Sequence, residues 1–591
     1  MKKILITLFA ISLFFGCKQK EGAAAANSDL AKLFDQYFED RMKLYPLEAT
    51  TQGDNRYNDQ LPNDIAQPFR DSAKVFYQKY LDKISAYNRE SLDENDRISF
   101  DIFKREMQMN LEGLTFKATW EIPFQQFWGL PITMGQLGSG SGSQPFKTVK
   151  DYQDWLKRVS AFSFWADTAI SNFKAGMADG TVLPKKLVEK MIPQMESMVV
   201  TDPKTSLFYD PIKNLPKDFS EADKKTLTDA YEKAINTELV PTYQKLANFL
   251  KLEYLPKARS TTGISEIPNG DNYYKYLIRF WTTTDRTPQQ IYDTGLAEVA
   301  RIKSEMEKTK ASVGFKGDLP SFFEFMKNDK QFMPFSTPKE VLDSFERIHQ
   351  IMIPQLKILF GRKPKTKFEI RQTEAFRAAS ASAEYNQGSA DGSRPGVFYV
   401  PILDAKTFNI TSGMESLFLH EAIPGHHYQI SLQQENSTLP KFRRFAWYGA
   451  YGEGWALYTE SLGKELGLYT NSYQYMGALG DEMHRAIRLV VDVAMHTKNI
   501  SREDAIKYMM SNEAISEQGA TAEIERYMAI PAQALSYKTG AMRIRELRAK
   551  YEKSLGAKFK ISDFHDEVLK DGVMPLEVFD RKMDAWAIKQ K

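Results

Sequence analysis

Three of the seven histidines in this 591-residue chain lie within eight positions of one another, beside a glutamate. They are His420, His426 and His427, and Glu421 directly follows the first of them. Imidazole is a common zinc ligand, and a catalytic zinc site takes three protein ligands and keeps a further position for water. A carboxylate next to such a site can take a proton from that water as general base. The segment therefore predicts a site for one zinc ion, with Glu421 as the base.

The spacing of these histidines differs from that of the usual helical zinc motif, in which the two histidines are four residues apart. That position holds Pro424, and the next histidines are six and seven residues after His420. In a straight helix, a residue six positions on lies about 9 Å along the axis and about 120° around it. Pro424 and Gly425 can kink the helix and let the chain bulge, so that two rings can meet. We expect His420 and His426 to be the ligand pair, with His427 as a competing ligand, a supporting residue or a substrate contact.

A third ligand is expected downstream, in the aromatic and glycine-rich segment 448–456. Within it, Glu453-Gly454-Trp455-Ala456 resembles the third-ligand helix of gluzincin peptidases, and Glu453 is the candidate. Glu460 follows two helical turns later on the same face. This position favours a supporting role, in which its carboxylate hydrogen-bonds to a ligand residue and does not bind the metal itself.

A short strand is predicted at residues 397–400, about twenty residues before the histidines. Zincin peptidases have an edge strand at this point, which holds an extended peptide by main-chain pairing. By that analogy, Val397 and Tyr399 are candidate substrate-binding residues.

Further candidates follow the motif. His484, Arg488, Asp492 and His496 repeat every four residues, so they share one helical stripe. Arg488 could bind a substrate carboxylate, while an internal ladder of ion pairs explains the stripe equally well. Tyr527 and Arg526 are candidate donors to a tetrahedral oxyanion, and an ordinary polar helix surface explains them as well.

The N-terminus resembles a bacterial lipoprotein signal. Lys2 and Lys3 precede an apolar run at residues 4–15, which is too short to span a bilayer because a spanning helix needs about 20 residues. The run ends at Gly16-Cys17, and Cys17 is the only cysteine, so no intramolecular disulfide can form. We expect a signal segment at 1–17, a tether at 18–28, and an exported protein held on a bacterial membrane by lipid on Cys17. An ordinary signal peptide or an uncleaved anchor is the alternative.

Composition excludes several classes of protein. The chain is 42% hydrophobic and 26% charged, which is typical of a folded soluble protein and not of a disordered one. Its 79 Lys and Arg residues nearly balance its 76 Asp and Glu residues. Because a nucleic-acid binder needs a basic surface, no nucleic-acid partner is expected.

Periodicity predicts a mainly α protein with a small sheet beside the histidines. Helical patterns cover residues 30–42 and, approximately, 65–115 and 150–255, and Thr287-Pro288 is typical of a helix start. Residues 46–62 and 138–143 are expected to be loops. We expect an N-terminal helical region at 29–262 and a catalytic region at 263–591, joined in one continuous body.

Together these segments resemble the bacterial family called domain of unknown function 885, which is grouped with the gluzincin metallopeptidases. The resemblance covers most of the chain, and it implies a large helical two-lobed body with a deep cleft, similar to angiotensin-converting-enzyme-like peptidases. The segments that carry it are 46–57, 267–274, 295–299, 394–396, 420–427, 453–456 and 525–540.

The expected function is zinc-dependent hydrolysis of peptide bonds. Two alternatives remain: an exported peptide-binding lipoprotein with a structural or vestigial metal site, and a zinc amidase that acts on non-peptide or cell-wall amides. A complete ligand set beside Glu421 argues against the first, because a structural site needs no general base.

Overall fold

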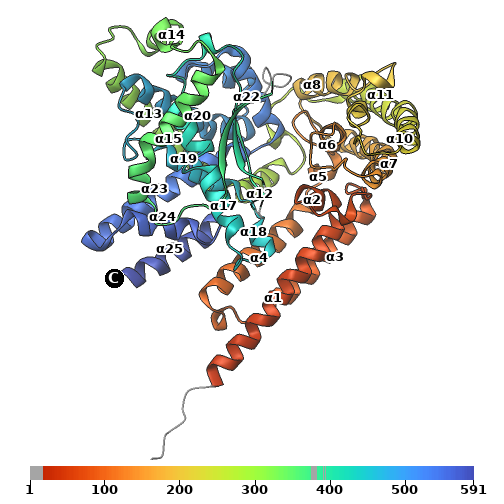
Figure 1. The fold of residues 1–591 in the computed structure, drawn as a ribbon, viewed down its shortest axis with the longest axis horizontal. Coiled ribbons are helices and arrows are strands. Elements are labelled where there is room, and N and C mark those ends of the chain that lie inside the picture. Colours follow the sequence, from red (N-terminus) through yellow and green to blue (C-terminus); the bar gives the residue numbers. More distant parts are fainter. Residues whose placement is uncertain (1–17, 375–381, 390–391, 393) are drawn as a thin grey trace, which may run out of the picture.

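A computed structural model of the chain describes residues 18–374, 382–389, 392 and 394–591. The predicted signal segment 1–17, with Cys17, lies outside the described residues. Most of the described chain is helical, and it includes one three-stranded sheet, so the predicted mainly α class is confirmed (Figure 1). In the described part of the chain, none of the helices is both long enough and apolar enough to cross a membrane.

The N-terminal helices pack beside the part of the chain that carries the histidines (Figure 1). The helix predicted at residues 30–42 lies within the longer α1, and the predicted loop at 46–62 contains a short helix that Pro46 begins. Residues 139–143 form an exposed connection, as predicted. The helices are α1 (Lys18–Leu44), α2 (Pro46–Thr51), α3 (Gln67–Ser85), α4 (Glu94–Gly113), α5 (Ala118–Glu121), α6 (Leu130–Gly138), α7 (Val149–Asp179), α8 (Lys185–Glu196), α9 (Asp210–Lys213), α10 (Glu221–Ala234) and α11 (Val240–Phe249).

The C-terminal helices surround the histidine motif. The predicted helix start at Thr287-Pro288 is confirmed, because Thr287 caps the first helix turn reciprocally with Gln290. The helices are α12 (Gly270–Thr282), α13 (Pro288–Ser312), α14 (Leu319–Asn328), α15 (Pro338–Leu359), α16 (Met414–Glu421), α17 (His426–Glu435), α18 (Lys441–Arg444), α19 (Gly449–Glu460), α20 (Ser472–Thr497), α21 (Arg502–Asn512), α22 (Glu517–Ala529), α23 (Ser536–Leu555), α24 (Ile561–Leu569) and α25 (Leu576–Gln590).

The sheet contains β1 (Phe368–Gln372), β2 (Glu384–Asn386) and β3 (Gly396–Val400), in the order β1-β3-β2. The predicted strand at 397–400 is confirmed, but its predicted edge position is wrong. β1 pairs with β3 in parallel and β2 pairs with its other side antiparallel, so both main-chain edges of β3 are occupied. Val397 and Tyr399 therefore cannot hold a peptide by main-chain pairing, and β1 and β2 are the edge strands of this sheet.

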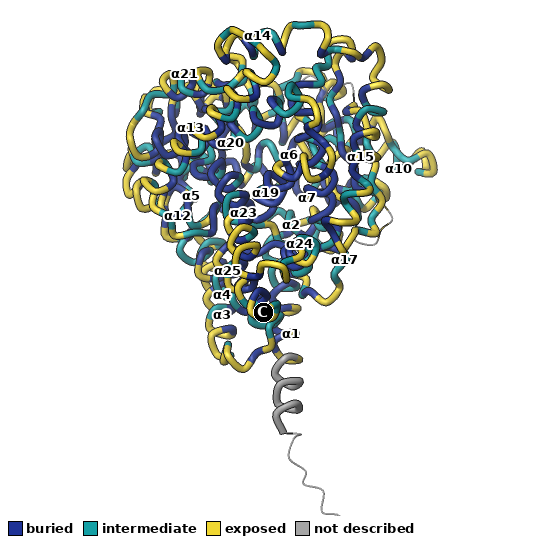
Figure 2. The backbone as a smooth tube through the Cα atoms, turned by 90° about the vertical axis from the view of Figure 1, so that its left-hand side faces the viewer, coloured by how far each residue is buried: buried dark blue, intermediate teal, exposed yellow. Residues whose placement is uncertain are grey.

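Two large hydrophobic cores support the fold. The first joins residues from 30–107 to residues from 335–587, and the second joins residues from 65–332 to residues from 476–534. Each core thus contains residues of both predicted regions, 29–262 and 263–591. Figure 2 shows that buried backbone runs through the middle of the body.

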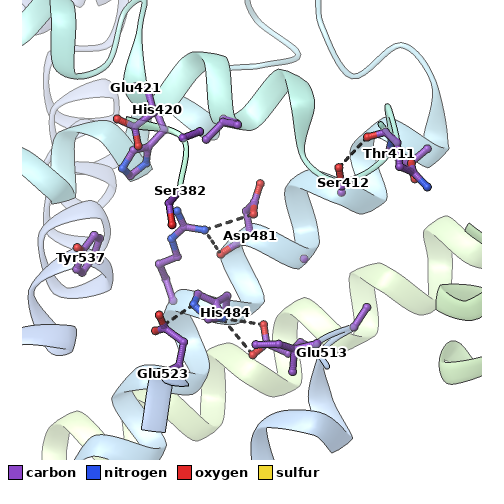
Figure 3. Close-up of a pocket in the computed structure, with 18 of the residues that line it drawn as sticks. Ser382, Thr411, Ser412, His420, Glu421, Asp481, His484, Glu513, Glu523 and Tyr537 are labelled. Carbon is purple, nitrogen blue, oxygen red and sulfur yellow. Dashed lines mark hydrogen bonds and ion pairs between the residues drawn. The ribbon is translucent and has the colours of Figure 1, made fainter. Parts of the chain in front are cut away.

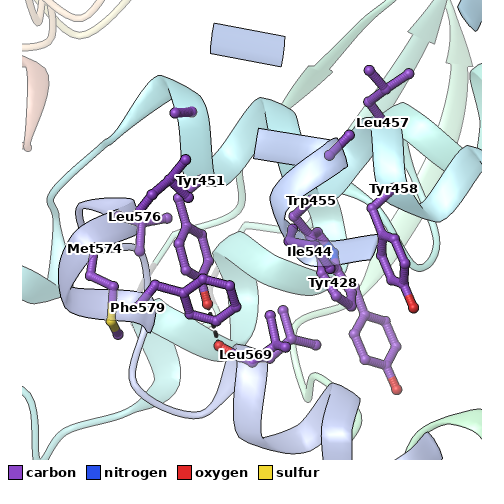
Figure 4. Packing of buried hydrophobic residues seen from close by; sticks show 14 of the residues in the cluster. Tyr428, Tyr451, Trp455, Leu457, Tyr458, Ile544, Leu569, Met574, Leu576 and Phe579 are labelled. Atoms are coloured by element: carbon purple, nitrogen blue, oxygen red, sulfur yellow. Dashed lines mark hydrogen bonds between the residues drawn. The ribbon is translucent and has the colours of Figure 1, made fainter. Parts of the chain in front are cut away.

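Helix α19 is buried on nearly every face. Tyr451, Trp455 and Tyr458 of this helix lie in the first core, where Tyr451 packs against Phe579 of α25 (Figure 4). On another side, a Cβ atom at Gly540 of α23 would lie 1.6 Å from the carbonyl oxygen of Ala450, so only glycine permits this helix crossing. The helix that carries Glu453 is therefore fixed by packing on several sides.

Candidate metal centre

The helix is interrupted completely between His420 and His426. Helix α16 ends at Glu421 and α17 begins at His426, so the break is larger than the bulge within one helix that the sequence predicts. A Cβ atom at Gly425 would lie 1.9 Å from the carbonyl oxygen of His420, which explains the need for glycine at this turn. The indole N–H of Trp455, on α19, donates to the carbonyl oxygen of Pro424 at 2.8 Å and anchors the turn.

The break brings the two histidine rings together with Glu453. The ring centroids of His420 and His426 are 4.9 Å apart and the rings are nearly perpendicular. Nε2 of each histidine lies 3.5 Å from Oε2 of Glu453. Around a tetrahedral zinc ion with bonds of 2.0–2.1 Å, ligand atoms are about 3.4 Å apart. The separation of Glu453 from each histidine thus matches the separation that a tetrahedral site needs.

Glu421 lies beside these ligand atoms. A carboxylate oxygen of Glu421 and one nitrogen each of His420 and His426 lie within 4.8 Å of one another. The residue predicted as the base is therefore within reach of a small molecule held among the ligands.

Glu460 supports His420 from the other side of its ring, as the sequence predicts. Its Oε1 lies 2.7 Å from Nδ1 of His420, and both side chains are buried. Burial lowers the pKa of His420, but hydrogen bonds to Glu453 and Glu460 outweigh it and raise that pKa to about 10. Burial raises the pKa of Glu453, but hydrogen bonds to His420 and His426 hold it well below its ordinary value. Without a metal ion, His420 is thus protonated at neutral pH and forms ion pairs with Glu453 and Glu460.

His427, the competing ligand, faces the sheet instead. Its Nδ1 lies 2.9 Å from the hydroxyl of Tyr385 on β2, and its ring packs on Phe368 of β1 at 4.9 Å. Burial, with a smaller contribution from His349, lowers the pKa of His427 to about 4, so the ring is neutral at physiological pH. Of the two histidines left open by the sequence, His426 joins the cluster.

The ligand cluster lies on the wall of a cavity of about 1180 Å³ (Figure 3). Because ligand pockets usually measure about 300–1,000 Å³, this cavity has room for a peptide of several residues. β2 forms one wall and methionines line another part. The lining includes His420, Glu421, His426, Glu453, Ser382, Glu384, Tyr385, Met306, Met326, Met333, Met476, Asp481, His484, Arg485, Arg488, Glu513, Glu523, Arg526 and Tyr537.

The stripe of charged residues on α20 divides into two pairs. His484 and Arg488 line the cavity, where Nη2 of Arg488 donates to Nε2 of His484 at 3.0 Å and to Glu523 at 3.1 Å. Asp492 and His496 lie in the interior: Asp492 accepts from the hydroxyl of Tyr274, and His496 from a backbone N–H. Arg488 therefore lines the cavity and also makes the contact between residues four apart that the alternative explanation expects, while Asp492 and His496 stabilise the fold.

The two predicted oxyanion donors differ in position. Arg526 lines the cavity, but Tyr527 is 1% exposed and lies behind the wall, where Nε of Arg488 donates to its hydroxyl at 2.9 Å. The prediction for Tyr527 as a direct donor is therefore wrong. Tyr537, in the donor-rich segment that follows, lines the cavity instead (Figure 3). The Arg488 guanidinium lies over its ring, 4.7 Å from the ring centroid. Spacing alone could not choose between these tyrosines.

Comparisons with known proteins agree with this architecture. One similar solved structure is that of a candidate lipoprotein from Colwellia psychrerythraea, with a TM-score of 0.87 and 27% sequence identity. The match covers 95% of this chain and 99% of that protein. A candidate lipoprotein of unknown function from Shewanella oneidensis is 20% identical, with a TM-score of 0.73, over 94% of this chain and 99% of that one, and it shows the shared fold. No curated protein matches the chain. The model of a bacterial protein family of unknown function, DUF885, matches residues 46–583. The protein belongs to the DUF885 family.

Proposed function

We propose that this protein is a zinc-dependent hydrolase of peptide bonds, related in its site to the gluzincin metallopeptidases. One observation carries the proposal: Nε2 of His420 and Nε2 of His426 each lie 3.5 Å from Oε2 of Glu453. Two imidazoles and one carboxylate are a common ligand set of catalytic zinc sites, and they leave a position free for water. One zinc ion per chain is the expected cofactor.

Each side chain has a defined task in this proposal. When bound, zinc lowers the pKa of a coordinated water molecule and polarises a carbonyl group. Glu421 takes a proton from the attacking water and delivers it to the leaving amine nitrogen. The hydroxyl of Tyr537, which makes no hydrogen bond within the described part of the chain, donates to the carbonyl oxygen as it gains negative charge. Arg488 and Arg526 bind polar groups of the substrate further along the cavity.

The two-lobed, peptidase-like body would hold a peptide in the large cavity, beside the edge strand β2. Lipid on Cys17 would attach the exported protein to a bacterial membrane, in agreement with the lipoprotein names of the two similar structures.

A substrate panel tests the proposal. Zinc-loaded protein comprising residues 18–591 is incubated with mixed-sequence peptides and with muropeptides, and parallel samples contain a chelator. Cleavage of peptide bonds that stops with the chelator and returns with zinc supports the proposal. Cleavage of muropeptide amides alone would favour the amidase alternative, and peptide binding without any cleavage would favour the binding lipoprotein.

A further inference from the structure

Tyr385 connects the proposed general base to the histidine that does not join the ligand cluster. Its backbone N–H donates to Oε2 of Glu421 at 3.0 Å, and its hydroxyl lies 2.9 Å from Nδ1 of His427. It belongs to the edge strand β2 and lines the cavity. One residue thus contacts both the carboxylate that follows His420 and the second histidine of the His426-His427 pair.

The surrounding chain leaves room for this arrangement. A Cβ atom at Gly396 of β3 would lie 2.2 Å from the Tyr385 hydroxyl and 2.7 Å from Nδ1 of His427. Because real Cβ atoms do not approach this closely, any other residue at 396 would displace the pair. The Oγ atom of Ser431 lies 3.4 Å from the same nitrogen, so Tyr385 is the closer partner.

The pairing of the strands explains why the N–H of Tyr385 is available to Glu421. Tyr385 lies opposite Phe398 in the antiparallel pair of β2 and β3. In such a pair, every second residue directs its N–H and C=O away from the partner strand. The N–H of Tyr385 reaches Glu421 on that outer side, which is the side of the cavity.

We infer that Tyr385 is a positioning residue: its backbone N–H holds the Glu421 carboxylate in the orientation for proton transfer, and His427 anchors it through its hydroxyl. The inference rests on the proposed function. With Oε2 held, the carboxylate cannot rotate freely, and within the described residues Oε1 accepts no hydrogen bond. That oxygen remains available for the proton of the attacking water. His427 thereby has a role that needs a hydrogen-bonding atom at the position of Nδ1 but no metal.

Steady-state kinetics on zinc-loaded protein provide the first test. Tyr385→Phe and His427→Leu each remove one partner of the hydrogen bond between the Tyr385 hydroxyl and His427. We expect kcat to fall about tenfold or more, because small misplacements of catalytic groups slow the reaction strongly. KM and zinc content should stay unchanged. The double variant should be no worse than either single one. His427→Asn keeps an acceptor near the position of Nδ1 and should restore much of the rate. Tyr428→Phe, which removes a neighbouring buried hydroxyl that donates to the backbone of Arg362, is the matched control and should retain full kcat.

Amide hydrogen exchange on the metal-free protein provides the second test, and it needs no activity. The amide of Tyr385 should exchange slowly in the wild type and about tenfold faster in Glu421→Ala and in His427→Leu, with no change in Tyr428→Phe. Unchanged exchange in Glu421→Ala and His427→Leu, or loss of zinc in His427→Leu, would overturn the inference. If the wild type cleaves no peptide, the proposed function fails, and the exchange measurement still decides whether Tyr385 and His427 position Glu421.

Discussion

Glu460 Oε1 lies 2.7 Å from Nδ1 of His420, while Oε2 of Glu453 lies 3.5 Å from Nε2 of the same ring. Both glutamates belong to α19 and are two helical turns apart. One buried helix therefore contacts both nitrogens of His420, with one carboxylate at the ligand cluster and the other behind it. Such support fixes the orientation of a ligand imidazole and strengthens its metal binding.

Removal of this support should weaken zinc binding. We expect Glu460→Ala to raise the zinc Kd by about 10–100-fold, and Glu460→Gln by less, because the amide keeps a hydrogen-bond partner for Nδ1. Competition with a chromophoric chelator measures the zinc Kd of both variants. Glu465→Gln, an exposed glutamate that pairs with Arg548, is the control and should bind zinc like the wild type. An unchanged Kd in Glu460→Ala would show that the contact does not support the ligand.

Substitution of the proposed base should separate catalysis from metal binding. Glu421→Gln keeps the size of the side chain but cannot take a proton, so kcat should fall at least about a hundredfold. Its zinc content should stay at that of the wild type, because the proposed ligands are intact. The measurement is peptide cleavage beside elemental analysis of the same sample. Activity within twofold of the wild type would remove Glu421 from the mechanism.

The turn between α16 and α17 should tolerate no side chain at residue 425. Gly425→Ala forces a methyl group against the carbonyl oxygen of His420, so it should lower the free energy of unfolding by about 1–3 kcal/mol or more and weaken zinc binding. Gly480→Ala is the matched control, because a Cβ atom there meets nothing within 4 Å. Since alanine favours a helix interior, it should stabilise α20 by about 0.5–1 kcal/mol. Urea denaturation compares them, and equal stabilities would contradict the proposed constraint.

Zinc binding should release a proton from His420. The pKa of His420 in the metal-free protein is about 10, because Glu453 and Glu460 outweigh the effect of burial, so the ring is protonated at neutral pH. A metal ligand must be deprotonated, so zinc displaces that proton, and the zinc Kd should fall about tenfold for each pH unit gained below pH 10. Calorimetry in buffers of different ionisation enthalpy counts the proton. A Kd independent of pH between 6.5 and 8.5 would contradict the protonated state.

The two tyrosines near Arg488 should give different phenotypes. Tyr537→Phe removes a hydroxyl on the cavity wall, so kcat should fall by about 10²–10³ while KM, zinc content and stability change little. Tyr527→Phe removes the buried partner of Arg488 and Glu523, so it should mainly lower the free energy of unfolding, by about 1–3 kcal/mol. Kinetics and denaturation on both variants separate the roles. A larger loss of kcat in Tyr527→Phe would restore the prediction made from the sequence.

The sequence predicted those features that depend on local pattern. Residue type and spacing indicated His420 and Glu421 as candidates, and the resemblance to the third-ligand helix of gluzincin peptidases added Glu453. The Pro-Gly pair indicated a kink or bulge before His426, where the structure has a complete break between two helices. The helix start at Thr287 was also predicted correctly, because it depends only on a cap and a proline within one turn. The mainly α class follows from helical periodicity over most of the chain.

Features that depend on distant contacts could not be predicted. The central position of β3 depends on its pairing with β2, a three-residue strand too short to give a periodic signal. His427 contacts Tyr385 instead of the ligand cluster, and Tyr385 is 42 residues away in the sequence. Likewise, Tyr527 and Tyr537 both lie in helical segments, so the sequence does not distinguish them. Which of the two side chains reaches the cavity depends on how α20 packs against α22 and α23.

The metal content of the purified protein shows whether His420 and His426 bind zinc. Protein comprising residues 18–591 is purified without chelators and analysed for bound metal beside His420→Ala, His426→Ala and His427→Ala. We expect one zinc ion per chain in the wild type and in His427→Ala, and less than about a tenth of that in the other two variants. A wild type that holds no zinc and takes up none when zinc is added, or a site lost in His427→Ala and kept in His426→Ala, would contradict this expectation.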